Sequence, residues 1–151
     1  MNANARETFG GFGATLKTPP LRLLLSTLVG GFAMWVVGGL WHNLIQPIFD
    51  RNVQAHHDGL GIVLIAYFVL AFLMAYIFSS TYQEGKSVVM EGLKIGVIIG
   101  ILWVFPHGLA MAGTHDTSIV YEFQNTFYHM VEQGIGGMII ALIMVKQIKK
   151  D

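Results

Sequence analysis

The chain has 151 residues, of which 54% are hydrophobic and only 12% are charged. A water-soluble domain of this size would need more polar surface, so the composition predicts an integral membrane protein with one domain over residues 1–151. Nine basic residues balance nine acidic ones, and there is no cysteine. We therefore expect no nucleic-acid partner. Disulfides, thiolate metal sites, cysteine nucleophiles and thioether-linked haem are excluded.

Four apolar segments follow a short N-terminal stretch, and each is close to the ~20 residues needed to cross a ~30 Å hydrocarbon core. Backbone groups in lipid must be paired within the segment, which favours helices. The sequence thus predicts an all-α fold, an integral membrane four-helix bundle. Pro47 is expected to end the first helix. Residues 1–20 are expected to lie at the membrane interface. The helices are predicted over residues 22–46, 60–79, 95–112 and 124–145.

The basic residues are distributed unevenly along this pattern. Arg51 follows the first apolar segment, whereas the other lysines and arginines precede the first segment, separate the second from the third, or follow the fourth. The positive-inside rule then predicts that both termini are cytoplasmic. The residues on the cytoplasmic side are Arg6, Lys17, Arg22, Lys86, Lys94, Lys146, Lys149 and Lys150.

Small residues recur at helical spacing and predict helix contacts. Glycine appears every fourth residue in the third segment, a pattern called a glycine zipper, which lets another backbone approach closely. The expected packing glycines are Gly31, Gly38, Gly92, Gly96, Gly100 and Gly136. The fourth segment also carries a polar stripe that should not face lipid. Its residues are Ser118, Glu122, Asn125, His129 and Glu132.

All six histidines fall on the non-cytoplasmic side of this topology. His42, His107 and His129 are expected at similar depth, near the outer surface. Glu132 lies one turn deeper than His129, and this pair resembles half of the motif in carboxylate-bridged metal bundles. Pro106 removes one backbone hydrogen bond and should open room beside His107. The sequence therefore predicts an outward-facing polar pocket whose candidate metal ligands are His42, His107, His129 and Glu132.

The same residues allow other interpretations. Histidines near helix ends are often interfacial, and a His–Glu pair can lock helices together without binding anything. The alternatives are structural polar packing or an open aqueous cavity, a metal or haem site, and a pocket for a small molecule, quinone or pigment. Tyr121 and Tyr128 are interpreted as interfacial or packing residues.

Four stretches carry a family resemblance: "GGLWHNLI", "AYFVLAFLMAYI", "GLKIGVIIGILWVFPHG" and "FYHMVEQGIGGMIIALI". Together they resemble a family of small bacterial four-helix membrane proteins known only as a domain of unknown function. The similarity covers residues 28–145. It implies the four-helix fold and a bacterial source, hence the inner membrane, and it implies no activity. The His42, His107 and His129 cluster does not come from this resemblance.

Three functions remain open on the sequence. The first is an interaction or accessory subunit that packs in the lipid bilayer against another membrane protein or against itself. The second is binding or transport of a ligand, metal or haem through the His/Glu pocket, since ionisable groups within membranes often mark such paths. The third is a metal-dependent membrane enzyme, for which the same four residues supply suitable ligand types. Catalysis is the least expected of the three.

Overall fold

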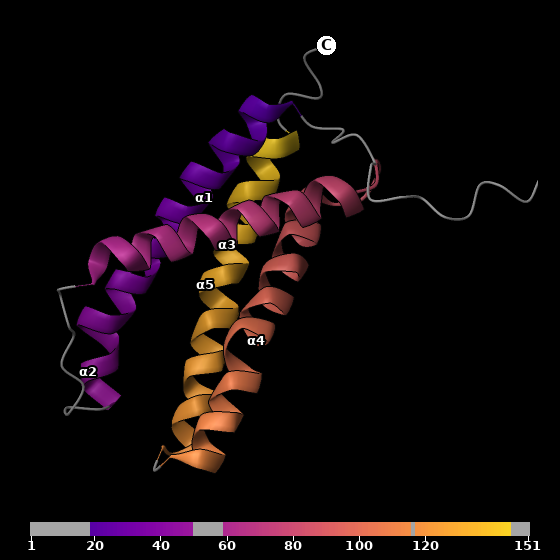
Figure 1. Ribbon diagram of the computed structural model, residues 1–151. Coiled ribbons are helices and arrows are strands. Elements are labelled where there is room, and N and C mark those ends of the chain that lie inside the picture. Colours follow the sequence, from indigo (N-terminus) through magenta and orange to yellow (C-terminus); the bar gives the residue numbers. More distant parts are fainter. Residues whose placement is uncertain (1–18, 50–58, 116, 146–151) are drawn as a thin grey trace, which may run out of the picture.

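The computed structural model describes residues 19–49, 59–115 and 117–145. Every element within these ranges is a helix (Figure 1). The predicted interfacial segment 1–20 lies outside them, apart from its last two residues. The elements are α1 (Pro20–Leu40), the π-helix η1 (Trp41–Ile45), α2 (Gln46–Phe49), α3 (Leu60–Thr81), α4 (Val88–Thr114) and α5 (Ile119–Val145).

Four helices are long and apolar enough to cross a membrane. The first is continuous through α1, η1 and α2 and spans Pro20–Ile48, and the other three are α3, α4 and α5. The predicted all-α class is therefore confirmed, and the fold is consistent with an integral membrane protein.

The first helix does not end at Pro47, so that boundary prediction was wrong. A proline inside an α-helix lacks an N–H, and its ring crowds the carbonyl four residues earlier. Here the turn before the proline is a π-helix, in which the Gln46 N–H donates to the Trp41 carbonyl five residues back. The wider turn changes which carbonyl faces the proline ring, so the helix continues to Phe49.

The third helix starts at Val88, well before the predicted residue 95. Its N-cap, Ser87, accepts a hydrogen bond from the Met90 N–H at 3.4 Å. Lys94 was expected between helices and instead lies within α4, where its ammonium is 2.9 Å from the Glu91 carboxylate. The helix also continues through Pro106 to Thr114. The prediction missed the first two turns of this helix because they carry charged side chains and so do not form an uninterrupted apolar segment.

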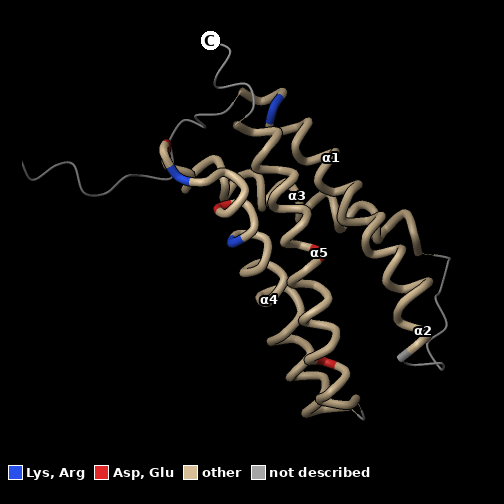
Figure 2. Tube along the Cα trace, turned by 180° about the vertical axis from the view of Figure 1, so that it is seen from behind, with Lys and Arg blue, Asp and Glu red and all other residues tan. Residues whose placement is uncertain are grey.

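The helices alternate in direction. The start of α1, the end of α3, the start of α4 and the end of α5 lie at one end of the molecule (Figure 1). All described lysines and arginines lie toward this end, which we call the basic end (Figure 2). Helix α5 is central, because it contacts α4, α1 and α3, whereas α1 and α4 do not contact each other over their described residues. Toward the opposite end the first helix diverges from the α4–α5 pair (Figures 1 and 2).

The apolar core fills the half of the bundle nearer the basic end. Ser26 and Thr27 lie within it, and both hydroxyls donate to the Leu23 carbonyl, at 3.0 and 2.7 Å. These polar groups are therefore satisfied by their own helix and need no water as a partner. The buried core consists of Leu23, Met34, Leu70, Ala71, Met74, Ala75, Phe78, Ile140, Ala141 and Met144.

The α4–α5 contact is made largely by backbone atoms. A methyl group added at Gly96 would overlap the Gln133 carbonyl, and one at Gly100 would overlap the His129 carbonyl. Gly92 meets Gly137 in the same way. Close backbone approach of this kind gains dispersion contacts along the whole pair.

The other three predicted packing glycines also lie between helices. Gly31 of α1 faces the Phe68 ring of α3, and Gly136 of α5 faces the Met34 side chain of α1. Gly38 of α1 faces a polar cluster built on α3 and α5. That cluster is the core of the candidate site.

Candidate functional site

The polar stripe of α5 is turned inward because α5 is the central helix. Glu132 is fully buried and Glu122 is 6% exposed, while Asn125 and His129 are partly buried. Ser118 is the exception, since it is exposed at the start of the stripe. The inward face of α5 therefore brings two carboxylates into the bundle.

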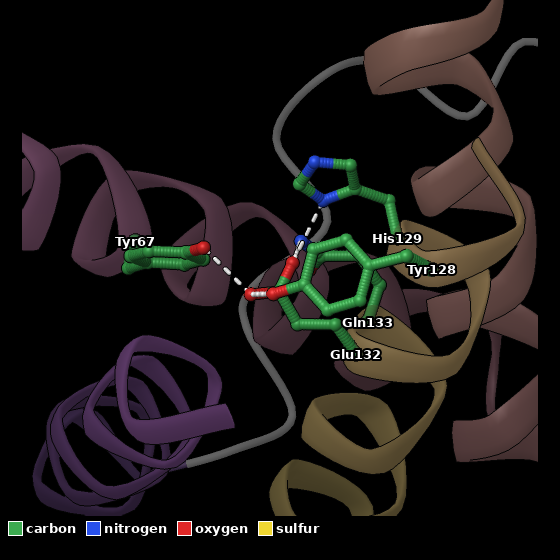
Figure 3. Close-up of polar contacts among 5 residues, drawn as sticks. All are labelled: Tyr67, Tyr128, His129, Glu132 and Gln133. Atoms are coloured by element: carbon green, nitrogen blue, oxygen red, sulfur yellow. Dashed lines mark hydrogen bonds and ion pairs between the residues drawn. The ribbon is translucent and has the colours of Figure 1, made fainter. Parts of the chain in front are cut away.

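The Glu132 carboxylate lies at the centre of a hydrogen-bonded cluster, which we call the Glu132 network (Figure 3). Its Oε1 accepts from the Tyr67 and Tyr128 hydroxyls, each at 2.6 Å. Its Oε2 is 2.8 Å from His129 Nδ1 and 3.1 Å from Gln133 Nε2. A carboxylate offers about four acceptor positions, so all of them are filled.

The Glu132 network joins two helices. Tyr67 comes from α3, whereas the other members belong to α5. An isolated buried carboxylate would be very costly, and several charge-assisted hydrogen bonds offset that cost. One polar atom is left over, because Gln133 Oε1 is buried and has no partner among the described residues.

The first helix closes over the network. A methyl group at Gly38 would crowd the Tyr67 hydroxyl and Glu132 Oε1, so only glycine lets α1 lie this close. Trp41, one turn farther on, stacks on Tyr128 with ring centroids 4.4 Å apart and planes inclined by 11°. Both contacts exclude lipid and water from the carboxylate.

His42 lies beside this cluster and not in the predicted pocket with the other histidines. Its Nδ1–H donates to Gln46 Oε1, and its ring meets the edge of Tyr128 at a centroid distance of 5.7 Å. Gln46 in turn donates to the Tyr121 hydroxyl at 3.3 Å. His42 therefore ties the π-helical segment to α5.

A polar pocket of about 400 Å³ lies between α4 and α5 toward the end opposite the basic end. We call it the α4–α5 pocket. Its walls come from the residues around Pro106, where room was expected, and from the first turns of α5. The polar and aromatic side chains that line it include Trp103, His107, Thr117, Glu122, Asn125 and His129.

Two acceptor groups at this pocket have no hydrogen-bond partner within the described ranges. Glu122 is more than nine-tenths buried, and no described residue donates to its carboxylate, which lies against the Cα of Gly108. The Thr117 hydroxyl oxygen is also buried and unpaired. Buried polar groups are normally paired with protein or water, so both groups are available to accept a hydrogen bond from water or a ligand in the pocket.

The four predicted metal ligands are not brought together as one set. His107 and His129 line the same pocket, and His129 binds Glu132, but neither Glu132 nor His42 lines that pocket. No group of three or more His, Cys, Asp or Glu in the described part of the chain is arranged to hold a metal ion. These residues do not fit a metal centre, and the haem alternative stays a prediction.

Sequence reasoning missed Tyr67 and Gln133, and it interpreted Tyr128 as a packing residue. Tyr67 carried a usable signal, because it is a hydrogen-bonding side chain in the middle of the apolar run of α3. A polar group at such a depth needs a partner, and Glu132 was available to supply one.

No protein-family model, curated protein or solved structure matches the chain.

Proposed function

We propose that the protein binds a small organic cation, such as a primary amine, in the α4–α5 pocket. The observation that carries this proposal is the Glu122 carboxylate, which is 6% exposed and unpaired among the described residues. A buried carboxylate without a donor is costly, and a cation removes that cost. An ammonium group has three donors. Glu122, Thr117 and Asn125 at the pocket provide oxygen acceptors for them.

The size and lining of the pocket support the same ligand class. About 400 Å³ is within the range of small-molecule sites, roughly 300–1,000 Å³. Trp103 also lines the pocket, and tryptophan is the best aromatic partner for a cation. An anion would instead meet the negative charge of Glu122.

In this proposal the cation enters and leaves the pocket from one side of the membrane and does not pass through the bundle. The half nearer the basic end is filled by the apolar core, and its buried hydroxyls bond to their own helix. A cation moving from Glu122 into the described core would meet apolar side chains and hydroxyls that already bond to their own helix, which replace its water poorly.

Binding of benzylammonium chloride to the protein in lipid nanodiscs tests this proposal. We expect Glu122→Gln to weaken the affinity by about 30-fold or more, because losing one partner of a buried charge pair costs about 2 kcal/mol or more. Glu91→Gln is the matched control, since Glu91 lies in the first turn of α4 at the basic end. Equal affinities for the original protein and Glu122→Gln, or no binding at all, would refute the proposal.

We further propose that the protein resides in a bacterial inner membrane with both termini cytoplasmic, as the family resemblance and the positive-inside rule imply. Support comes from the described lysines and arginines, which gather at one end of the bundle (Figure 2). The α4–α5 pocket would then face the periplasm.

The chain contains no cysteine, so single cysteines report this orientation directly. Gly113 is exposed near the end of α4, with open space around it, and Gln83 is exposed in the turn between α3 and α4. We expect an impermeant thiol reagent to label Gly113→Cys in spheroplasts with intact membranes, and Gln83→Cys only after lysis. The reverse labelling pattern would show that the termini lie on the periplasmic side and would contradict the proposed topology.

An accessory subunit of a membrane complex, or a homo-oligomer, is a second candidate. The specific observation is a stripe of exposed apolar side chains on α3, spaced alternately three and four residues apart as in helix seams. A transmembrane helix of another protein or of a second copy would pack there. A mass in mild detergent equal to one chain would count against the oligomer. The stripe consists of Ile62, Ile65, Val69, Phe72 and Tyr76.

A further inference from the structure

We propose that the His129–Glu132 pair holds one exchangeable proton and that a cation entering the α4–α5 pocket displaces it. This inference rests on the proposed cation binding and adds a coupled reaction to it. The site would then exchange one positive charge for another, a proton for an organic cation.

The first step of the argument is access. Glu132 is fully buried and does not line the α4–α5 pocket. Among its four donors, His129 is the one that does line that pocket, with 12% of its side chain exposed. Tyr67 lines a separate and mainly apolar pocket of about 220 Å³ beside α3. His129 is therefore the bridge between the buried carboxylate and the polar pocket.

The second step is the chemistry of the imidazole. One ring nitrogen, Nδ1, faces Glu132 Oε2 at 2.8 Å, and the other points away from the carboxylate (Figure 3). When Nδ1 carries the proton and donates it to an ionised Glu132, Nε2 is a free acceptor. A proton taken from a hydronium ion binds Nε2 and releases one water molecule. The pair then changes from a net charge of −1 to zero.

The third step is the charge around the pair. His107 of α4 and Glu122 of α5 line the same pocket as His129, and the Tyr128 ring lies beside the His129 ring. Around Glu132, α3 contributes Tyr67, while α1 contributes only the glycine Gly38. His42 of η1 lies edge-on to Tyr128. The described lysines and arginines are at the basic end, so no fixed cation in the described ranges neutralises Glu122 and Glu132.

Displacement follows from this geometry. Protonated His129 and an ammonium ion at Glu122 would place two positive charges around one pocket of about 400 Å³. Like charges that line one pocket repel each other. Entry of the ligand therefore favours loss of the proton from Nε2 to water, and a higher proton concentration opposes binding of the ligand.

Calorimetry of benzylammonium binding in two buffers with different ionisation enthalpies counts the protons released. While the free protein holds the proton on this pair, we expect release of about one proton per ligand bound and an affinity that rises about tenfold per pH unit. The rise should level off at higher pH, where the free protein has already lost this proton. The pH series uses the unaltered protein, so it does not depend on the folding of any variant.

Two asparagine variants identify the group that carries the proton. His129→Asn keeps an N–H directed at Glu132 but cannot bind a proton, so we expect binding without release. His107→Asn is the matched control from the opposite wall, and it should still release one proton. If proton release persists in His129→Asn and disappears in His107→Asn, the assignment of the proton to His129 is overturned. If the unaltered protein binds benzylammonium without releasing a proton, the coupling of binding to proton release is overturned and the proposed function stands. If it does not bind benzylammonium, the proposed function is overturned as well.

Discussion

Replacing Gly96 with alanine is expected to destabilise the bundle by about 3 kcal/mol, at the upper end of the usual cost of overpacking. The added methyl group would overlap the carbonyl of Gln133 and the Cα of Gly134, which are backbone atoms. No side-chain rotation relieves such an overlap, so α4 and α5 would have to separate. Unfolding in mixed micelles, followed by circular dichroism against the detergent composition, measures the loss.

Gly39→Ala is the matched control for this experiment. Gly39 is also a helical glycine, but a methyl group there meets nothing within 4 Å. Alanine should be neutral or should stabilise the helix by up to about 1 kcal/mol, because it has the higher helix propensity. Equal stabilities for Gly96→Ala and Gly39→Ala would mean that the α4–α5 contact is looser than the structure indicates.

This contact also positions the site. Gly96 meets the backbone of Gln133, and Gly100 meets the backbone of His129, so both glycines pack against residues that bind Glu132. A shift of α4 away from α5 would therefore change the α4–α5 pocket and the Glu132 network together. Stability and ligand binding should fall in parallel across substitutions at this interface.

Features that depend on one helix at a time were predictable from the sequence. The four spans follow from apolar length, and the polar stripe of α5 follows from helical spacing. The contact between His129 and Glu132 follows from their separation of three residues, which places them on one face.

Features that depend on how helices are rotated against each other were not predictable. His42 and His129 were placed at similar depth in one pocket, yet only His129 lines the α4–α5 pocket, because the rotation of the first helix about its axis is set by packing at Gly31 and Gly38. The bond from Tyr67 to Glu132 joins residues 65 positions apart and likewise depends on the register of α3 against α5. Helix spacing within one segment carries no information on that register.

Replacing Glu132 with leucine is expected to be the most damaging change in the site, with a loss of about 3–5 kcal/mol in the free energy of unfolding, as when one partner of a buried ionic pair is removed. Four hydrogen-bond donors would lose their acceptor. They are the hydroxyls of Tyr67 and Tyr128, the His129 ring and the Gln133 amide. Each donor would remain buried, and water could not replace the carboxylate beneath Gly38 and Trp41.

Glu132→Gln has nearly the same shape, removes the charge and keeps one of the two acceptor oxygens. Its carbonyl can still accept from both tyrosines. Its amide replaces Oε2 and can only donate, so it would donate to His129 Nδ1 when the imidazole carries its proton on Nε2, and to Gln133 Oε1, an acceptor without a partner among the described residues, once the Gln133 side chain rotates. We therefore expect a loss of about 1–1.5 kcal/mol, close to that of one hydrogen bond. The same mixed-micelle unfolding assay compares the two variants. If leucine proves as stable as glutamine at this position, the four hydrogen bonds do not stabilise the bundle, and the bond from Tyr67, the one that joins α3 to α5, does not hold these helices together.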